Sequence, residues 1–141
     1  MRLPSWWLLF LAWIVATIAT LGSLFFSEVM HYPPCVLCWY QRICMYPLCF
    51  IFLTGMFPLN KSVTRYAFPL AITGWFISFY HNLLYYKILP ESAGPCVKGI
   101  SCTTVFFNWL GFITIPLLSL ISFSFILILI FLTHRSFQVE N

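Results

Sequence analysis

Four apolar stretches, each long enough to cross a lipid bilayer, occupy most of this 141-residue chain. They cover residues 5–27, 39–59, 66–86 and 109–133, and a spanning helix needs about 20 apolar residues. Only 7% of the residues are charged, whereas a soluble domain carries about 25%. The sequence therefore predicts an all-α integral membrane protein, with one domain over residues 1–141 built as a bundle of four transmembrane helices. Little of the chain remains for a soluble catalytic domain.

The first stretch has one alternative interpretation. Arg2 precedes it, as a basic residue precedes the apolar part of a cleaved signal peptide. The apolar run is longer than the usual 7–15 residues of such a peptide, and it begins with Trp6 and Trp7, whose rings favour a membrane interface. We therefore expect a helix that stays in the protein.

Four helices place both termini and the turn around residue 62 on one side of the membrane, and the other two connections on the opposite side. The terminal side carries four basic residues, Arg2, Lys61, Arg65 and Arg135, and the opposite side carries Lys87 and Lys98. Because basic residues are retained in the cytoplasm, both termini are predicted to be cytoplasmic in a multi-pass cell-membrane protein. The basic residues form no patch, so nucleic-acid binding is not expected.

Four of the six cysteines lie in the two connections predicted to be extracytoplasmic, as Cys35-x-x-Cys38 and Cys96-x5-Cys102. Passing a disulfide between molecules needs one thiolate to attack and one to resolve, and each pair supplies both. Cys35 and Cys38 precede or open the second helix, where free N–H groups and the helix dipole stabilise a thiolate. These four cysteines are the candidate catalytic residues.

Other roles for the cysteines remain open. Cys35 and Cys38 could form a structural disulfide or half of a metal site, and Cys96 and Cys102 could staple their loop. Closed zinc sites usually pair two C-x-x-C motifs or add histidines at short spacing, so we assign no metal ligands. Cys44 and Cys49 lie inside the second helix and are interpreted as packing residues.

Two polar residues within the apolar stretches are candidate cofactor-binding residues. Arg42 lies four residues after Cys38, one helical turn deeper on the same face. It either extends to the nearby interface or holds the Cys38 thiolate and an electron acceptor in the membrane. His81, in the third stretch, either bonds to a neighbouring helix or contacts the same acceptor.

The segment from Pro34 to Arg42, Pro-Cys-Val-Leu-Cys-Trp-Tyr-Gln-Arg, resembles the DsbB family of membrane disulfide oxidoreductases. It lies at the start of the second of four helices, and a cysteine pair follows in a later loop, as in that family. The small size and the C-x5-C loop are most similar to the BdbC-type members. The second pair of better-known members is much more widely spaced than Cys96 and Cys102.

The resemblance implies a route for electrons. An extracytoplasmic thioredoxin-fold dithiol partner, similar to DsbA or BdbD, would attack Cys96 and release Cys102. The electrons would pass to Cys35 and Cys38, and from Cys38 to a quinone in the membrane beside Arg42, with His81 close to the family's helix-three histidine. The implied function is disulfide bond formation in exported proteins. Two alternatives remain: a metal-handling membrane protein with outward-facing thiols, and a non-enzymatic four-helix protein with structural disulfides.

Overall fold

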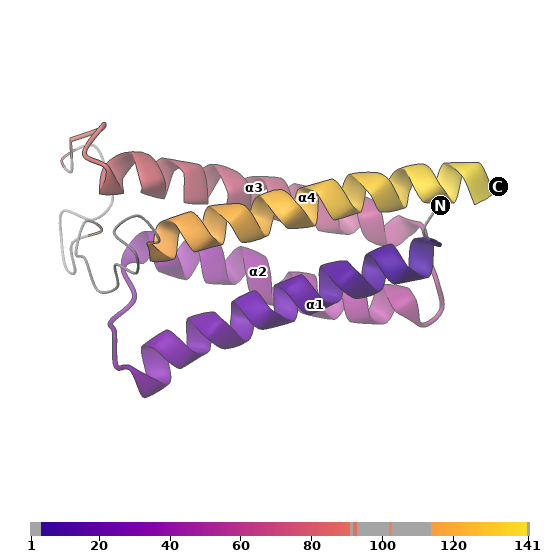
Figure 1. Ribbon diagram of the computed structural model, residues 1–141, viewed down its shortest axis with the longest axis horizontal. Helices are drawn as coiled ribbons and strands as arrows, with labels where there is room; N and C mark the ends of the chain where they lie inside the picture. The colour runs from indigo at the N-terminus through magenta and orange to yellow at the C-terminus, as the bar shows by residue number, and fades with distance from the viewer. Residues whose placement is uncertain (1–3, 91, 93–101, 103–113, 141) are drawn as a thin grey trace.

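The computed structural model describes residues 4–90, 92, 102 and 114–140. Within them the regular structure is α1 (Ser5–Leu24), the π-helical turn η1 (Phe25–Val29), α2 (Val36–Met56), α3 (Ser62–Tyr85) and α4 (Ile115–Glu140). α1 packs against α2 and α4, and α3 packs against the same two helices. Figure 1 shows the four helices side by side, with both termini and the α2–α3 turn at one end. The all-helical prediction is therefore confirmed.

The helix bounds differ from the predicted ranges by a few residues at most ends. Helix α2 begins at Val36 instead of 39, because Cys35 serves as its N-cap. Helix α3 begins at Ser62 instead of 66, where the Asn60 side chain accepts a hydrogen bond from the Ser62 N–H group at 2.9 Å. Helix α4 continues to Glu140, beyond its predicted end at residue 133. Residues 109–113, the predicted start of this helix, lie outside the described residues.

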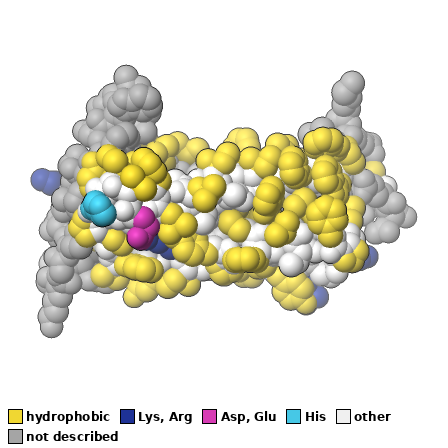
Figure 2. Space-filling model, turned by 90° about the horizontal axis from the view of Figure 1, so that it is seen from below, with side chains coloured by type: hydrophobic (Ala, Val, Ile, Leu, Met, Phe, Trp, Pro, Cys, Tyr) yellow, Lys and Arg dark blue, Asp and Glu magenta, His cyan; other side chains and the backbone are white. Residues whose placement is uncertain are grey.

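Three of the described helical segments are long and apolar enough to cross a membrane: Ser5–Val29, Val36–Met56 and Ile115–Val139. Their large apolar side chains, such as Ile18, Phe50 and Ile128, are exposed on the outside of the bundle. Figure 2 shows hydrophobic side chains spread over the length of one face. The chain is thus a membrane protein by its composition and its surface. Helix α3 has sufficient length, but it carries Arg65, His81 and Asn82 and is less apolar.

Small residues bring the helices close together in the core. Ala12 and Ala16 of α1, and Ala67 and Ala71 of α3, are at most 1% exposed. In α3, a Cβ atom at Gly74 would clash with the ring of Phe123 from α4. Close backbone approach of this kind drives helix association in membranes, where the hydrophobic effect contributes little.

Hydrogen bonds made by side chains join α3 to α4. Ser78 and Ser119 share a hydroxyl contact of 2.9 Å, and Trp75 Nε1 donates to Ser124 Oγ at 2.9 Å. The Asn82 amide donates to the carbonyl of Pro116 at 2.9 Å, near the start of α4. These bonds fix the position of α3 along the bundle axis, and with it the position of His81, the neighbour of Asn82.

Candidate redox centre

The cysteine pair lies where α2 begins. Pro34 cannot continue a preceding helix, and Cys35 has the extended backbone of an N-cap, with φ −72° and ψ 170°. The Cys35 sulfur accepts a hydrogen bond from the backbone N–H group of Cys38 at 3.4 Å. One helical turn then brings the two sulfurs to 3.0 Å from each other. Both residues are free thiols. Their sulfurs are close enough to form a disulfide after a small rotation of the side chains.

His81 of α3 completes the surroundings of this pair. It is 2% exposed, and its Nε2 atom lies 3.8 Å from the Cys35 sulfur. The same nitrogen is 3.3 Å from the carbonyl oxygen of Cys102. Its Nδ1 atom is 3.1 Å from the side-chain nitrogen of Gln41. His81 of α3 therefore contacts both α2 and Cys102.

The hydrogen bond with Cys38 is the main reason that the Cys35 thiol is acidic. Together with the hydrogen bond and the charge of His81, it lowers the pKa of Cys35 from 9.0 to about 4, although burial acts in the opposite direction. With Cys35 ionised, the Cys38 thiol is the donor of the bond between the two sulfurs. Cys35 is thus a thiolate at neutral pH and a good leaving group in thiol–disulfide exchange.

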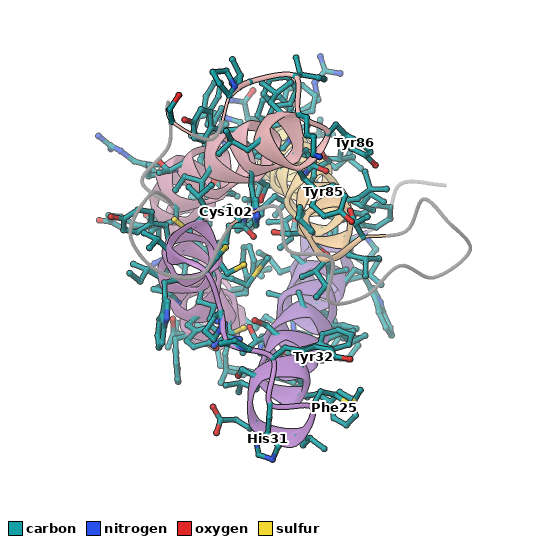
Figure 3. The ribbon with its side chains drawn as sticks, turned by 90° about the vertical axis from the view of Figure 1, so that its left-hand side faces the viewer. Phe25, His31, Tyr32, Tyr85, Tyr86 and Cys102 are labelled. Atoms are coloured by element: carbon teal, nitrogen blue, oxygen red, sulfur yellow. The ribbon has the colours of Figure 1, made fainter. Side chains whose placement is uncertain are left out.

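Cys102 lies next to the pair. It is 5% exposed and belongs to the same small buried cluster as Cys35, Leu37 and Leu84. Viewed from the end opposite the termini, it lies in the middle of the four helices, whereas His31 lies at the rim (Figure 3). Cys102 is in a disulfide, and the other four described cysteines are free. Cys96 lies outside the described residues.

A cavity of about 420 Å³ extends from the cysteines into the bundle. Its walls come from α1, α2 and α4, with His81, Tyr85 and Cys102 at the end that holds the pair. Volumes of roughly 300–1,000 Å³ are typical of sites for small molecules and cofactors. The cavity joins the reactive thiols to the apolar interior of the protein.

Arg42 is on the wall of this cavity together with Cys38, as the i, i+4 spacing predicts. It is 9% exposed. Its Nε atom donates to the Ser23 hydroxyl and its Nη2 atom to the Ser23 carbonyl of α1, each at 2.8 Å. The guanidinium carbon also lies 5.5 Å from the centre of the Trp39 ring. These contacts hold a charged group inside the bundle, and some of its N–H groups make no hydrogen bond within the described part of the chain.

Three residues around the cavity were not recognised from the sequence. Gln41 contacts His81, and Ser23 holds Arg42. The hydroxyl of Tyr46 is buried and has no hydrogen-bond partner within the described part of the chain, although Tyr46 lines the cavity. Tyr46 lies four residues after Arg42, and that spacing was the available signal.

The remaining thiols in α2 pack against other residues. Cys44 is 5% exposed and belongs to the main core. Cys49 is partly buried beside that core, with its sulfur 3.3 Å from the hydroxyl of Thr20. Neither lines the cavity, in agreement with the packing role predicted for them.

The fold and the site define a helical membrane protein whose partly buried cysteine pair is suited to thiol–disulfide exchange. The model of the family "Disulfide bond formation protein DsbB" matches residues 4–133. The chain therefore belongs to the DsbB family.

Several curated proteins are similar to this chain over nearly its whole length. "Disulfide bond formation protein C" of Bacillus subtilis is 50% identical over 126 residues, which are 88% of each chain. "Probable disulfide formation protein C 1" of Bacillus anthracis is 44% identical, over 91% of this chain and 92% of that protein. "Probable disulfide formation protein" of Metapseudomonas resinovorans is 41% identical, over 93% and 92%. No solved structure gives a significant match. The family implies disulfide oxidoreductase activity.

Proposed function

We propose that this protein reoxidises an extracytoplasmic thioredoxin-fold dithiol partner and delivers the electrons to a membrane quinone, which sustains disulfide formation in exported proteins. The observation that carries the proposal is that the Cys35–Cys38 pair lies between two features. Cys102 shares its buried cluster, and Cys38 lines the cavity. Two redox couples in contact with each other, one of them at a cavity in the membrane, form a relay.

The outer exchange begins at the disulfide that we assign to Cys96 and Cys102. A thiolate of the partner attacks Cys96, and Cys102 leaves as a thiolate. The second partner thiol then attacks the mixed disulfide and releases Cys96. The partner has lost two electrons and two protons and holds a disulfide, and Cys96 and Cys102 are reduced.

The inner exchange moves the same two electrons to α2. The Cys102 thiolate attacks Cys35 in a Cys35–Cys38 disulfide, and Cys38 leaves. Cys96 then attacks Cys102 and restores the outer disulfide, so that both α2 cysteines are reduced. A disulfide at Cys102 together with free Cys35 and Cys38 corresponds to this stage of the cycle.

The residues around the cavity fit a quinone, which carries two carbonyl acceptors. Arg42 has N–H groups beyond the two bonded to Ser23. The buried Tyr46 hydroxyl lacks a partner in the described structure and can donate from the same helix one turn further along. A bound quinone would supply the two-electron, two-proton acceptor that the reduced pair needs. His81 holds the Cys35 side of the pair and can carry a proton at Nε2.

For the membrane arrangement, we propose four transmembrane helices, with α3 as the fourth span inside a single domain over residues 1–141. Each of its two neighbours is a membrane-capable helix, and its 24 residues are sufficient to cross the bilayer. Both termini would then be cytoplasmic and both cysteine pairs extracytoplasmic. Labelling of intact cells with a membrane-impermeant thiol reagent tests this arrangement, since cytoplasmic thiols would remain unlabelled.

The relay is tested with purified protein, a reduced thioredoxin-fold dithiol protein and a quinone whose absorbance reports its reduction. Cys38→Ser should abolish quinone reduction, and Cys49→Ser, in the same helix, should leave it unchanged. A partner that keeps only its attacking cysteine should be trapped as a mixed disulfide with Cys96, because Cys102 leaves and no second partner thiol is present to release Cys96. Normal turnover by Cys38→Ser would contradict the assigned donor, and a trap through Cys35 would reverse the order of the two pairs.

A further inference from the structure

The same corner of the bundle contains a group of metal-ligating atoms that the sequence does not bring together. The sulfurs of Cys35 and Cys38 and a ring nitrogen of His81 all lie within 4.8 Å of one another. His81 is 46 positions after Cys35 in the chain. We propose that the reduced protein binds one thiophilic metal ion of the zinc class through Cys35, Cys38 and His81, and that this binding holds the pair in its dithiol state.

The distances suit a zinc-sized ion after small side-chain rotations. Tetrahedral zinc with bonds of about 2.3 Å to sulfur and about 2.0 Å to nitrogen places two sulfurs about 3.8 Å apart and a sulfur and a nitrogen about 3.5 Å apart. The sulfurs are 3.0 Å apart, and Cys35 Sγ is 3.8 Å from His81 Nε2. Both distances lie within about 1 Å of the required values. Moving the sulfurs apart therefore needs no change in the helices.

The histidine is already supported on its far side, as metal-ligating histidines usually are. Gln41 is 7% exposed, and its amide is 3.1 Å from His81 Nδ1. A metal on Nε2 requires the proton on Nδ1, and a half-turn of the Gln41 amide presents its oxygen to that proton. Gln41 can thus stabilise both tautomers of His81: the one protonated on Nδ1, which binds a metal through Nε2, and the one protonated on Nε2, which does not.

The ligand set also selects the metal and makes binding depend on redox state. Two thiolates and one neutral imidazole favour Zn²⁺ or Cd²⁺ and disfavour Mg²⁺ and Ca²⁺. The two thiolate charges balance a divalent cation, which matters in a buried site. A Cys35–Cys38 disulfide removes two of the three ligands. The metal would therefore compete with oxidation of the pair and slow the relay.

The test is a titration of the reduced full-length protein in detergent with Cd²⁺, followed by the ultraviolet absorption of cadmium–thiolate bonds. We expect one Cd²⁺ per chain, with none bound after the same preparation has been oxidised. Comparing two redox states of one protein makes this result independent of any variant's folding. Equal binding in both states, or no binding in the reduced state, would overturn the proposal.

Variants separate a three-ligand site from simple capture by a dithiol. His81→Asn should weaken Cd²⁺ binding by at least about tenfold. Cys44→Ser and Cys49→Ser, matched controls in the same helix, should bind as the natural chain does. Zn²⁺ should protect Cys35 from alkylation until a chelator is added. Unchanged affinity in His81→Asn would refute the third ligand. These measurements use neither quinone nor partner, so their outcome is independent of the proposed relay.

Discussion

The pH profile of Cys35 alkylation tests the arrangement at the start of α2. At pH values below its pKa of about 8.5, an ordinary cysteine reacts about tenfold faster for each unit by which the pH rises. The contacts with Cys38 and His81 lower the pKa of Cys35 to about 4. Cys35 is then fully ionised at every pH above about 6, because ionisation is complete about two units above a pKa. We expect an alkylation rate that is flat between about pH 6 and pH 8.

The slope of the profile, and not the rate, is the informative quantity. Lowering the pKa from 9.0 to about 4 raises the thiolate fraction at pH 7 by about a hundredfold. The same change lowers the intrinsic nucleophilicity by about 100- to 300-fold, because thiolate reactivity falls with pKa with a coefficient of about 0.4–0.5. The two effects nearly cancel at pH 7. Cys35 should therefore react within about threefold of an ordinary thiol at that pH, and only its pH dependence should differ.

The assay uses the reduced protein in detergent, with iodoacetamide and mass spectrometry of the peptide that contains Cys35. Cys38→Ala removes the contact that contributes most to the low pKa, so the profile of this variant should acquire a rise with pH. Cys49→Ala should keep the flat profile, because Cys49 does not line the cavity. A tenfold rise per pH unit in the natural chain would refute the proposed stabilisation of the Cys35 thiolate.

Three further predictions follow from the cavity, the core and the thiol pair. Tyr46→Phe should raise the Kd for a quinone about 3- to 10-fold, as expected for one lost hydrogen bond, with no change in Cys35 alkylation; an unchanged Kd would exclude the Tyr46 hydroxyl as a donor. Gly74→Ala should lower the free energy of unfolding by about 1–3 kcal/mol, because its methyl group meets the Phe123 ring. Gly22→Ala should leave the free energy of unfolding unchanged, because a methyl group at Gly22 meets no other atom. Equal effects of the two substitutions would contradict the close packing of Gly74 against Phe123. The folded-state pKa of Cys35 is about 4 and its unfolded value 9.0, so the contribution of Cys35 to the stability of the reduced protein should be complete near pH 9 and be lost as the pH falls toward 4, by up to about 1.4 kcal/mol per unit. The oxidised pair does not titrate, so an equal pH dependence of thermal unfolding in both redox states would refute this linkage.

The helical architecture could be predicted because its cause is local. Uninterrupted apolar stretches must satisfy their backbone groups internally in a membrane, so their positions follow from composition alone. The start of α2 was predicted only approximately: Cys35 and Cys38 were expected to precede or open the helix, and Cys35 is its N-cap. Helix ends were less accurate, since α4 continues through polar residues up to Glu140, where hydropathy gives no signal.

Contacts between helices could not be predicted, because they depend on how the helices rotate and on their relative heights. The sequence marks His81 as unusual, but only the packing of α3 on α2 brings it to Cys35 and Gln41. The spacing of the motif places Arg42 near Cys38, and nothing in it indicates that Ser23 of α1 would bind the guanidinium. The spacing within α2 therefore predicted which residues of that helix lie together, but it could not predict which residues α1 and α3 contribute to the site.

The polar residues that lower the hydropathy of α3 are the same residues that position His81 at the cysteine pair. This helix carries the buried polar residues Ser78, His81 and Asn82, each of which would be costly in lipid without a partner. Ser78 and Asn82 bond to α4, and His81 bonds to α2 and Cys102. The bonds to α4 prevent α3 from sliding or rotating, and they keep the His81 ring at the height of the Cys35 sulfur. A more apolar α3 would resemble a membrane span more closely, but it would lose the contacts that hold His81 beside the cysteine pair.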